Sequence, residues 1–392
     1  MQKRIYALGL AAIILFFSGC SSIFQKEYIS VTKYTEEEHN EYWNSAVEVS
    51  DYDELKSEIY SMVQGHVEQE RLNFSGYEGD LDEDFIRGEL SRAFREIQNE
   101  TALGSYAVLH FSHYDLIQII TRYEVTVYIN YRRTQEEVSG IGYVSGKSRL
   151  PGYLDNMLSA LETTACFRMN VSDLSESEVL SALKNAFESN PVACVLPPEA
   201  AVTIHPAGGP EYIIELELVY PKSGISIVNM RQALNIELEA ILNQILADDE
   251  QASALQAYNF ISSRVQYDPN GEIRRGNDNL DPTLGSSIYG ALVDGYADSY
   301  GIALAFSAIC REAGIECLVV TGTQNKLEHS WNLVRLGDNF YHVDVSADAV
   351  LGVPGAFGRS DEQMNGYWWF IEDYPEAALS LNAENIFSSG AQ

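Results

Sequence analysis

The chain has 392 residues, of which 46% are hydrophobic, and this is enough material for two or three hydrophobic cores. Its 57 acidic and 25 basic residues give a net charge of −32 at pH 7. A surface this acidic repels polyanions, so we expect no nucleic acid among its partners. Five cysteines in so long a chain do not form a disulfide scaffold, and Cys166 with Cys194 is the only pair worth testing.

The first 20 residues have the pattern of a targeting segment. Two basic residues precede an apolar run at 5–17, which is shorter than the roughly 20 residues of a transmembrane helix. A small-residue pair and Cys20 follow, and this end resembles a bacterial lipoprotein signal. The resemblance implies export, acylation of Cys20, and anchoring in the lipid bilayer at the outer face of the cytoplasmic membrane or in the cell envelope. An ordinary secretory signal is the alternative, and we expect residues 21–48 to form a tether.

Residues 49–147 and 148–224 contain the same succession of predicted elements. Each segment has a helical pattern, a strand, a second helical pattern and two further strands, and Leu90 corresponds to Leu183. We interpret this as a degenerate internal repeat. The predicted fold class is therefore α+β, with two small repeat units, each a sheet with helices on one side, followed by a further domain.

A bridging helix is expected within 225–249, ahead of the last domain at 250–380. The acidic loop at 268–281 suggests a calcium site, but it lacks the spacing of an EF-hand, and we favour a solvent loop near a cleft. His110 and His113 are interpreted as residues of a strand end. The sequence thus predicts neither a metal site nor a cofactor.

Within the last domain, which begins with the segment 252–265, a further helix starts near Ser299, and its apolar residues recur every three or four positions until Gly314 ends it. A buried strand is predicted at 315–321. His329 starts the next strand, and a hairpin leads to a third strand that ends near Asp344. A hairpin of this length can place the imidazole and the carboxylate on neighbouring strands, facing the same side. A helix end, a histidine and an aspartate in this order are typical of thiol acyl-transfer enzymes.

Short motifs make the comparison more specific. The relevant residues are Gly301, Ala303, Ala305, Phe306, Gly314, Ile315, Cys317, His329, Trp331, Asn332, Val343 and Asp344. They resemble the C-x-G-Y-A-x-A-F, G-I-x-C, H-A-W-N and V-D-x-T motifs of the bacterial transglutaminase-like superfamily, which is related to papain-like cysteine peptidases. The resemblance covers about residues 250–375 and puts Ser299 at the position of the nucleophilic cysteine. It implies catalytic positions for His329 and Asp344, and a cleft beside Gly301, Trp331 and Asn332.

A serine at this position weakens the chemistry. A thiol with a reference pKa of about 8.5 becomes a resting thiolate beside a helix end and an imidazolium, whereas a serine hydroxyl loses its proton only during attack. Two roles stay open for Ser299: helix N-cap, which we favour, or working nucleophile with His329 as base and Asp344 as orienting group. Cys310 and Cys317 are expected in the hydrophobic core.

The run YWWFI at 367–371 predicts an aromatic strand that packs in the core, with a ligand platform as the alternative. Residues 381–392 are expected to form a tail. We expect a lipid-anchored, extracytoplasmic pseudoenzyme that binds a peptide or a peptidoglycan stem, or that acts as a scaffold. The alternatives are an acyl transferase or peptidase that uses Ser299, His329 and Asp344, and a purely structural lipoprotein.

Overall fold

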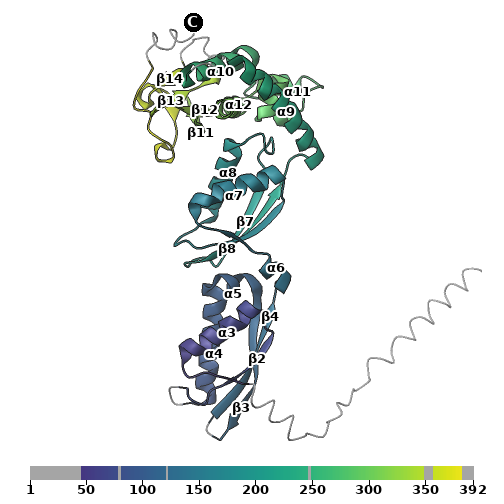
Figure 1. The fold of residues 1–392 in the computed structure, drawn as a ribbon, viewed down its shortest axis with the longest axis vertical. Coiled ribbons are helices and arrows are strands. Elements are labelled where there is room, and N and C mark those ends of the chain that lie inside the picture. The colour runs from purple at the N-terminus through teal and green to yellow at the C-terminus, as the bar shows by residue number, and fades with distance from the viewer. Residues whose placement is uncertain (1–45, 78–80, 121, 246–248, 348–355, 382–392) are drawn as a thin grey trace, which may run out of the picture.

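The computed structural model describes residues 46–77, 81–120, 122–245, 249–347 and 356–381. The predicted signal segment with Cys20, most of the predicted tether and nearly all of the predicted tail lie outside these residues. Figure 1 shows three bodies stacked along the long axis, from the first unit at one end to the C-terminal domain at the other. No helix among the described residues is long and apolar enough to cross a membrane.

The first unit is a four-stranded sheet with helices α3 and α4 packed against it. Its elements are β1 (Val47–Glu48), α3 (Tyr52–Gly65), β2 (Gln69–Asn73), α4 (Glu83–Glu100), α5 (Ala102–Ala107), β3 (Val108–Ile119) and β4 (Arg122–Tyr131). The strand order is β1-β2-β4-β3. Asp51 and Asp82 cap the first turns of α3 and α4 with their carboxylates. The unit encloses a core of its own, to which the second unit adds the buried Ile213 and, packed against the core, the partly buried Val138, Ile141 and Cys166.

The second unit has the equivalent strand order, β5-β6-β8-β7. Its elements are α6 (Gln135–Ser139), β5 (Gly142–Val144), α7 (Leu150–Ala160), β6 (Thr164–Met169), α8 (Glu176–Ser189), β7 (Glu199–His205) and β8 (Tyr212–Val219). In both units the short first strand pairs in parallel with the next one. Both sheets therefore begin before residues 49 and 148, where the repeat units were predicted to start. The sequence did not indicate these first strands, because strands of two or three residues carry no readable periodicity. Descent from one duplicated unit stays a prediction.

The C-terminal domain shares its core with the second unit. Helix α9 (Gly224–Ile245) occupies the predicted bridging segment, and its Leu234 and Ile241 belong to the same buried cluster as Leu183 of α8 and Phe306 of the C-terminal domain. These two bodies therefore form one continuous hydrophobic unit.

A single helix packed on a five-stranded antiparallel sheet forms the centre of this domain. The strand order is β14-β13-β12-β11-β15, and the central strands pair as two successive hairpins. The elements are α10 (Glu250–Arg264), β9 (Gln266–Tyr267), α11 (Glu272–Arg275), β10 (Tyr296–Ala297), α12 (Ser299–Glu312), β11 (Cys317–Gln324), β12 (Leu327–Leu336), β13 (Asn339–Val343), β14 (Phe357–Arg359) and β15 (Tyr367–Trp368). Helix α12 packs against β11 and β12.

The cysteines of the described chain are free thiols. Cys166 lies half-buried in β6 and Cys194 is buried, and the pair does not form a disulfide. Cys310 is buried in α12, as predicted, whereas Cys317 is only half-buried at the start of β11. Since neither Cys310 nor Cys317 lines the pocket described below, neither replaces Ser299 there.

Candidate active-site pocket

Asp298, and not Ser299, caps helix α12. The Asp298 backbone is extended, and its Oδ1 accepts a hydrogen bond from the Gly301 amide at 2.9 Å. Ser286 Oγ donates to the other carboxylate oxygen. Burial raises the pKa of Asp298, although the hydrogen bonds from Ser286 and from backbone amides oppose the shift. The predicted N-cap role of Ser299 is therefore wrong by one residue, and Ser299 is the first residue of the helix with its hydroxyl free for other contacts.

Gly301 allows the chain to pack tightly beneath the start of α12. A Cβ at this position would lie 2.8 Å from the Gly285 carbonyl oxygen and 3.0 Å from that of Ser287. Any side chain here would push the loop and the helix apart. Gly301 thus fixes the position of Ser299. It was predicted to line the cleft, and this prediction is wrong, because Gly301 is not among the residues that line the pocket.

The hairpin of β12 and β13 brings His329 and Asp344 together. His329 Nε2 donates to Asp344 Oδ2 at 2.7 Å, and both side chains are buried. Asp344 Oδ2 also accepts from the Tyr367 hydroxyl at 2.6 Å, and Asp344 Oδ1 accepts from Ser346 Oγ at 2.7 Å. Burial alone would raise the pKa of Asp344, but the contacts with His329, Tyr367 and Ser346 outweigh it and hold the pKa below its ordinary value. The aspartate is therefore a fixed anion that orients the imidazole.

Ser299 lies beside this pair without bonding to it. Ser299 Oγ accepts a hydrogen bond from the amide of Ser330, the residue after His329, at 3.2 Å. Within the described part of the chain, no hydrogen bond joins Ser299 to His329. Because Asp344 engages Nε2, the other ring nitrogen of His329, Nδ1, is the one that can exchange a proton inside the pocket. The three predicted residues therefore meet at one place.

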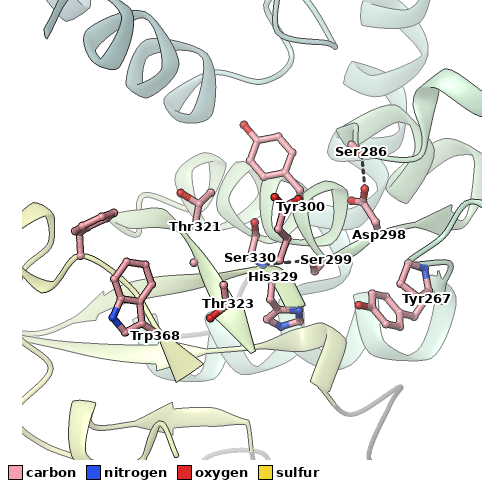
Figure 2. Close-up of a pocket in the computed structure, with 14 residues that line it drawn as sticks. Tyr267, Ser286, Asp298, Ser299, Tyr300, Thr321, Thr323, His329, Ser330 and Trp368 are labelled. Carbon is pink, nitrogen blue, oxygen red and sulfur yellow. Dashed lines mark hydrogen bonds between the residues drawn. The ribbon is translucent and has the colours of Figure 1, made fainter. Parts of the chain in front are cut away.

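These side chains open onto a pocket of about 590 Å³ (Figure 2). Its lining comes from the start of α12, from β11 and β12, and from the segment around β15. The lining residues are Tyr267, Pro269, Ser286, Asp298, Ser299, Tyr300, Thr321, Gly322, Thr323, Glu328, His329, Ser330, Trp368 and Phe370. No lysine or arginine is among them. The pocket is therefore polar and weakly acidic, with an aromatic wall on one side.

The aromatic wall corrects the prediction of a core strand at 367–371. Only Tyr367–Trp368 forms a strand, β15, and the side chains of Trp368 and Phe370 are 55% and 60% exposed. Their rings pack edge to face with centroids 4.7 Å apart. Gly322 makes this placement possible, because a Cβ there would lie 2.1 Å from the Trp368 carbonyl oxygen. The run of aromatic letters concealed that alternate residues face opposite sides.

Trp331 and Asn332 support the pocket from below and do not line it. Trp331 Nε1 donates to His342 Nδ1 at 2.9 Å, and His342 Nε2 donates to Asp361 Oδ1 at 2.7 Å. Asn332 Nδ2 donates to the Ala303 carbonyl oxygen at 3.0 Å, which ties β12 to α12. The predicted cleft roles of these two residues are therefore wrong, and no sequence pattern indicated the second histidine–aspartate pair.

Helix α8 of the second unit holds two of the lining residues from outside the pocket. The Tyr300 hydroxyl donates to Glu188 Oε1 of α8 at 3.0 Å, and Lys184 Nζ donates to Thr321 Oγ1 at 3.0 Å. Burial and the neighbouring Glu188 raise the pKa of Tyr300, while burial raises that of Glu188. The contacts join residues more than 100 positions apart in the chain, so local patterns could not predict them.

The loop at 268–281 is held by an arginine. The buried Arg274 guanidinium donates to the carbonyl oxygens of Asp281 and Tyr296 and to Asp294 Oδ2 at 2.6 Å. Asp268 accepts from two backbone amides, one of them that of Arg274. The conformation of the loop is thus held by the Arg274 guanidinium and by backbone amides. In the described ranges, no group of three or more His, Cys, Asp or Glu side chains is placed to hold a metal ion.

Comparison with known proteins agrees with this geometry. Residues 239–345 match the sequence model of the Transglutaminase-like superfamily. This part of the chain is therefore a transglutaminase-like domain, and the predicted mixed α and β fold ending in such a domain is confirmed. No curated protein matches the chain.

Three solved structures are similar to parts of it. A transglutaminase crystal structure has 11% sequence identity and a TM-score of 0.27, over 55% of this chain and 56% of that one. A proposed cysteine protease from Cytophaga hutchinsonii has 14% identity and a TM-score of 0.23, over 38% and 62%. A proposed protease from Parabacteroides distasonis has 7% identity and a TM-score of 0.22, over 72% and 60%. The chain thus spans less than two thirds of the length of each.

Proposed function

We propose that this protein is an exported lipoprotein, anchored through acylated Cys20, whose transglutaminase-like domain binds a peptide without acyl transfer. The ligand class that we favour is a peptide such as a peptidoglycan stem. The observation that carries the proposal is the state of Ser299, whose hydroxyl oxygen accepts from the Ser330 amide while no described hydrogen bond links it to His329.

The chemistry of a hydroxyl supports binding over catalysis. A cysteine beside a helix end is largely ionised when an imidazolium is near, so it needs no proton transfer at the moment of attack. A serine must pass its proton to a base that contacts it. The Ser299 oxygen lacks such a contact with His329, and an amide hydrogen bond to this oxygen lowers its electron density further.

The lining of the pocket supports a peptide as ligand. The exposed rings of Trp368 and Phe370 offer an apolar surface for a side chain, and the hydroxyls of Thr321 and Thr323 can pair with peptide groups. The lining lacks basic side chains, which disfavours phosphate-rich ligands. A cleft with these properties fits a peptide segment that offers an apolar side chain and backbone hydrogen-bonding groups.

Thermal unfolding with soluble stem peptides tests this proposal. We expect bound peptide to raise Tm, because a ligand that binds only the folded state stabilises it. The shift should persist in Ser299→Ala and should be lost in Trp368→Ala. Ile236→Ser, which changes an exposed aliphatic residue of α9 outside the pocket, is the matched control and should keep the shift. A shift of equal size in Trp368→Ala would contradict the proposal.

The intact His329–Asp344 pair favours a second candidate, a serine acyl-transfer enzyme. In that case Ser299 attacks, His329 Nδ1 takes its proton and Asp344 stabilises the imidazolium. Incubation with a fluorophosphonate probe and with an amine donor distinguishes the two functions. Labelling of Ser299, absent from Ser299→Ala and His329→Gln, would establish the enzyme, and the binding proposal expects none.

Anchoring is tested separately. Cells that express the full chain and are fed an alkyne-bearing fatty acid should incorporate it into the wild-type protein but not into Cys20→Ser. Label retained in Cys20→Ser, or absent from both, would contradict acylation at this residue.

A further inference from the structure

The β3–β4 hairpin of the first unit ends in an uncharged, aliphatic tip. This hairpin tip, residues 116–120, has the sequence LIQII, although 21% of the whole chain is charged. Ile117 is 48% exposed and Ile120 is 91% exposed. Isolated exposed aliphatics are ordinary, but Ile117 near the end of β3 and Ile120 just past that end together give a small apolar surface that water solvates poorly.

The hairpin tip projects beyond the rest of its sheet. The ladder between β2 and β4 ends at the Asn73–Glu124 pair, whereas β3 and β4 stay paired out to Ile119 and Arg122. The Phe74 amide still donates to the Tyr123 carbonyl oxygen at 2.8 Å, so the extension begins at Arg122 and is one to two residues, or roughly 3–7 Å of strand.

The N-terminal side of the chain enters the first unit beside this tip. Strand β1 pairs with β2 so that Glu48 lies level with Asn73, and hence with Glu124 at the base of the projection. Two strand spacings separate β1 from β4, which is roughly 10 Å. The C-terminal domain, which contains the pocket, lies at the opposite end of the molecule (Figure 1). The first described residues of the chain thus lie at the same end of the first unit as the exposed aliphatic tip.

We infer that the hairpin tip inserts into the surface of a lipid bilayer. The inference rests on the proposed anchoring, because the 27 peptide steps from Cys20 to Val47 (47 − 20) span at most about 95 Å and so limit how far the first unit can lie from the membrane. Two isoleucines alone give weak, reversible binding, but an anchor makes the second contact intramolecular and raises its effective concentration. Insertion at this end would hold the pocket away from the membrane.

The net charge of the protein determines which lipid headgroups favour insertion. A chain with a net charge of −32 is repelled by anionic headgroups, while the uncharged tip gains from burial in any lipid. We therefore expect insertion into zwitterionic phosphatidylcholine vesicles, weakened by added anionic lipid at low salt.

Brominated lipids measure the insertion directly. The chain from Cys20 onward, which contains every described residue, is coupled through Cys20 to a maleimide-bearing lipid in phosphatidylcholine vesicles. The fluorescence of Ile120→Trp should be quenched by brominated acyl chains, after subtraction of the native tryptophan signal. Leu109→Trp, at an exposed site on the same strand near the opposite end of the hairpin, is the matched control and should not be quenched. Adding Ile117→Ser to Ile120→Trp should lower the inserted fraction about tenfold, which is the loss expected for one buried isoleucine.

Equal quenching of the Ile120→Trp and Leu109→Trp variants would overturn the inference, because it would indicate contact without a preferred end. A concentration-dependent dimer in which the introduced indole of Ile120→Trp is shielded without vesicles would also overturn it and would assign the tip to a second copy. Chemical coupling separates this test from acylation in cells. Absence of fatty acid on Cys20 would remove the lipoprotein proposal, whereas an unquenched Ile120→Trp variant in coupled protein would remove only the insertion.

Discussion

Replacing Ser299 with cysteine tests the geometry of the site through the pKa of the new thiol. The reference value is about 8.5. The first position of α12 adds helix-dipole stabilisation of about 1 kcal/mol, or roughly 0.7 of a pKa unit. An imidazolium at His329 lowers a neighbouring acid by about 1–3 units, and burial opposes both effects. We therefore expect the thiol of Ser299→Cys to titrate between about 5 and 7, within the range of activated cysteines.

The assay follows thiolate absorbance and iodoacetamide alkylation across pH. The midpoint is the quantity to compare, because a more acidic thiol is also a weaker nucleophile and its rate at one pH is ambiguous. Wild-type protein supplies the baseline, since burial raises the pKa of Cys194 to about 12 and that of Cys310 well above its ordinary value. The double variant Ser299→Cys/His329→Gln should return the midpoint towards about 8.5, the reference value. A single variant that already titrates near that value would refute the placement of Ser299 beside the imidazole.

Three further predictions concern the frame of the pocket. Gly322→Ala should displace β15 and abolish peptide binding, because the new Cβ would clash with the Trp368 carbonyl oxygen; the expected cost is about 1–3 kcal/mol in the free energy of unfolding. Gly88→Ala in α4 is the control, because a Cβ there meets nothing within 4 Å, and it should raise the free energy of unfolding by about 0.5–1 kcal/mol. Tyr367→Phe should cost about 1.5–3 kcal/mol in chemical denaturation, because it removes a hydrogen bond to the buried anion Asp344. Burial lowers the pKa of His342 despite its contact with Asp361, so the unfolded chain binds a proton at this histidine at a higher pH than the folded chain does. The contribution of neutral His342 to the free energy of unfolding should therefore be fully present above about pH 6.5 and fall as the pH drops below that value.

Each of these has a result that would count against the structure. Unchanged binding in Gly322→Ala would mean that β15 does not need the close approach. A Tyr367→Phe variant as stable as wild type would show that the hydroxyl contributes nothing to holding Asp344. For the third prediction, His342→Gln should flatten the acidic limb of the stability profile, and an identical limb in the variant would assign the titration to another group.

The sequence predicted the parts of the site that depend on short-range order. The hairpin between β12 and β13 has a fixed register, so the separation of His329 and Asp344 along the chain was enough to place them together. The helix was also predicted, but its cap was not. Asp298 and Ser299 are both residues that favour the N-cap, and an apolar period cannot choose between neighbours.

The rest of the pocket depends on packing between distant segments. Trp368 faces the pocket because β15 pairs with β11 at Thr323, a pairing that no local pattern encodes. Glu188 reaches Tyr300 only because the second unit and the last domain share one core. Trp331 was expected in the cleft because of its motif, yet its ring is among the largest fully buried side chains. A motif identified the elements of the site correctly but not the direction in which each side chain points.

The central claim is that the pocket holds a peptide without reacting with it. The most direct measurement is the mass spectrum of protein and stem peptide after long incubation at a concentration where thermal unfolding shows binding. We expect both masses to be unchanged, in wild type and in Ser299→Ala alike. A cleaved or cross-linked peptide, or an acyl adduct on Ser299 that the Ser299→Ala variant lacks, would contradict the claim.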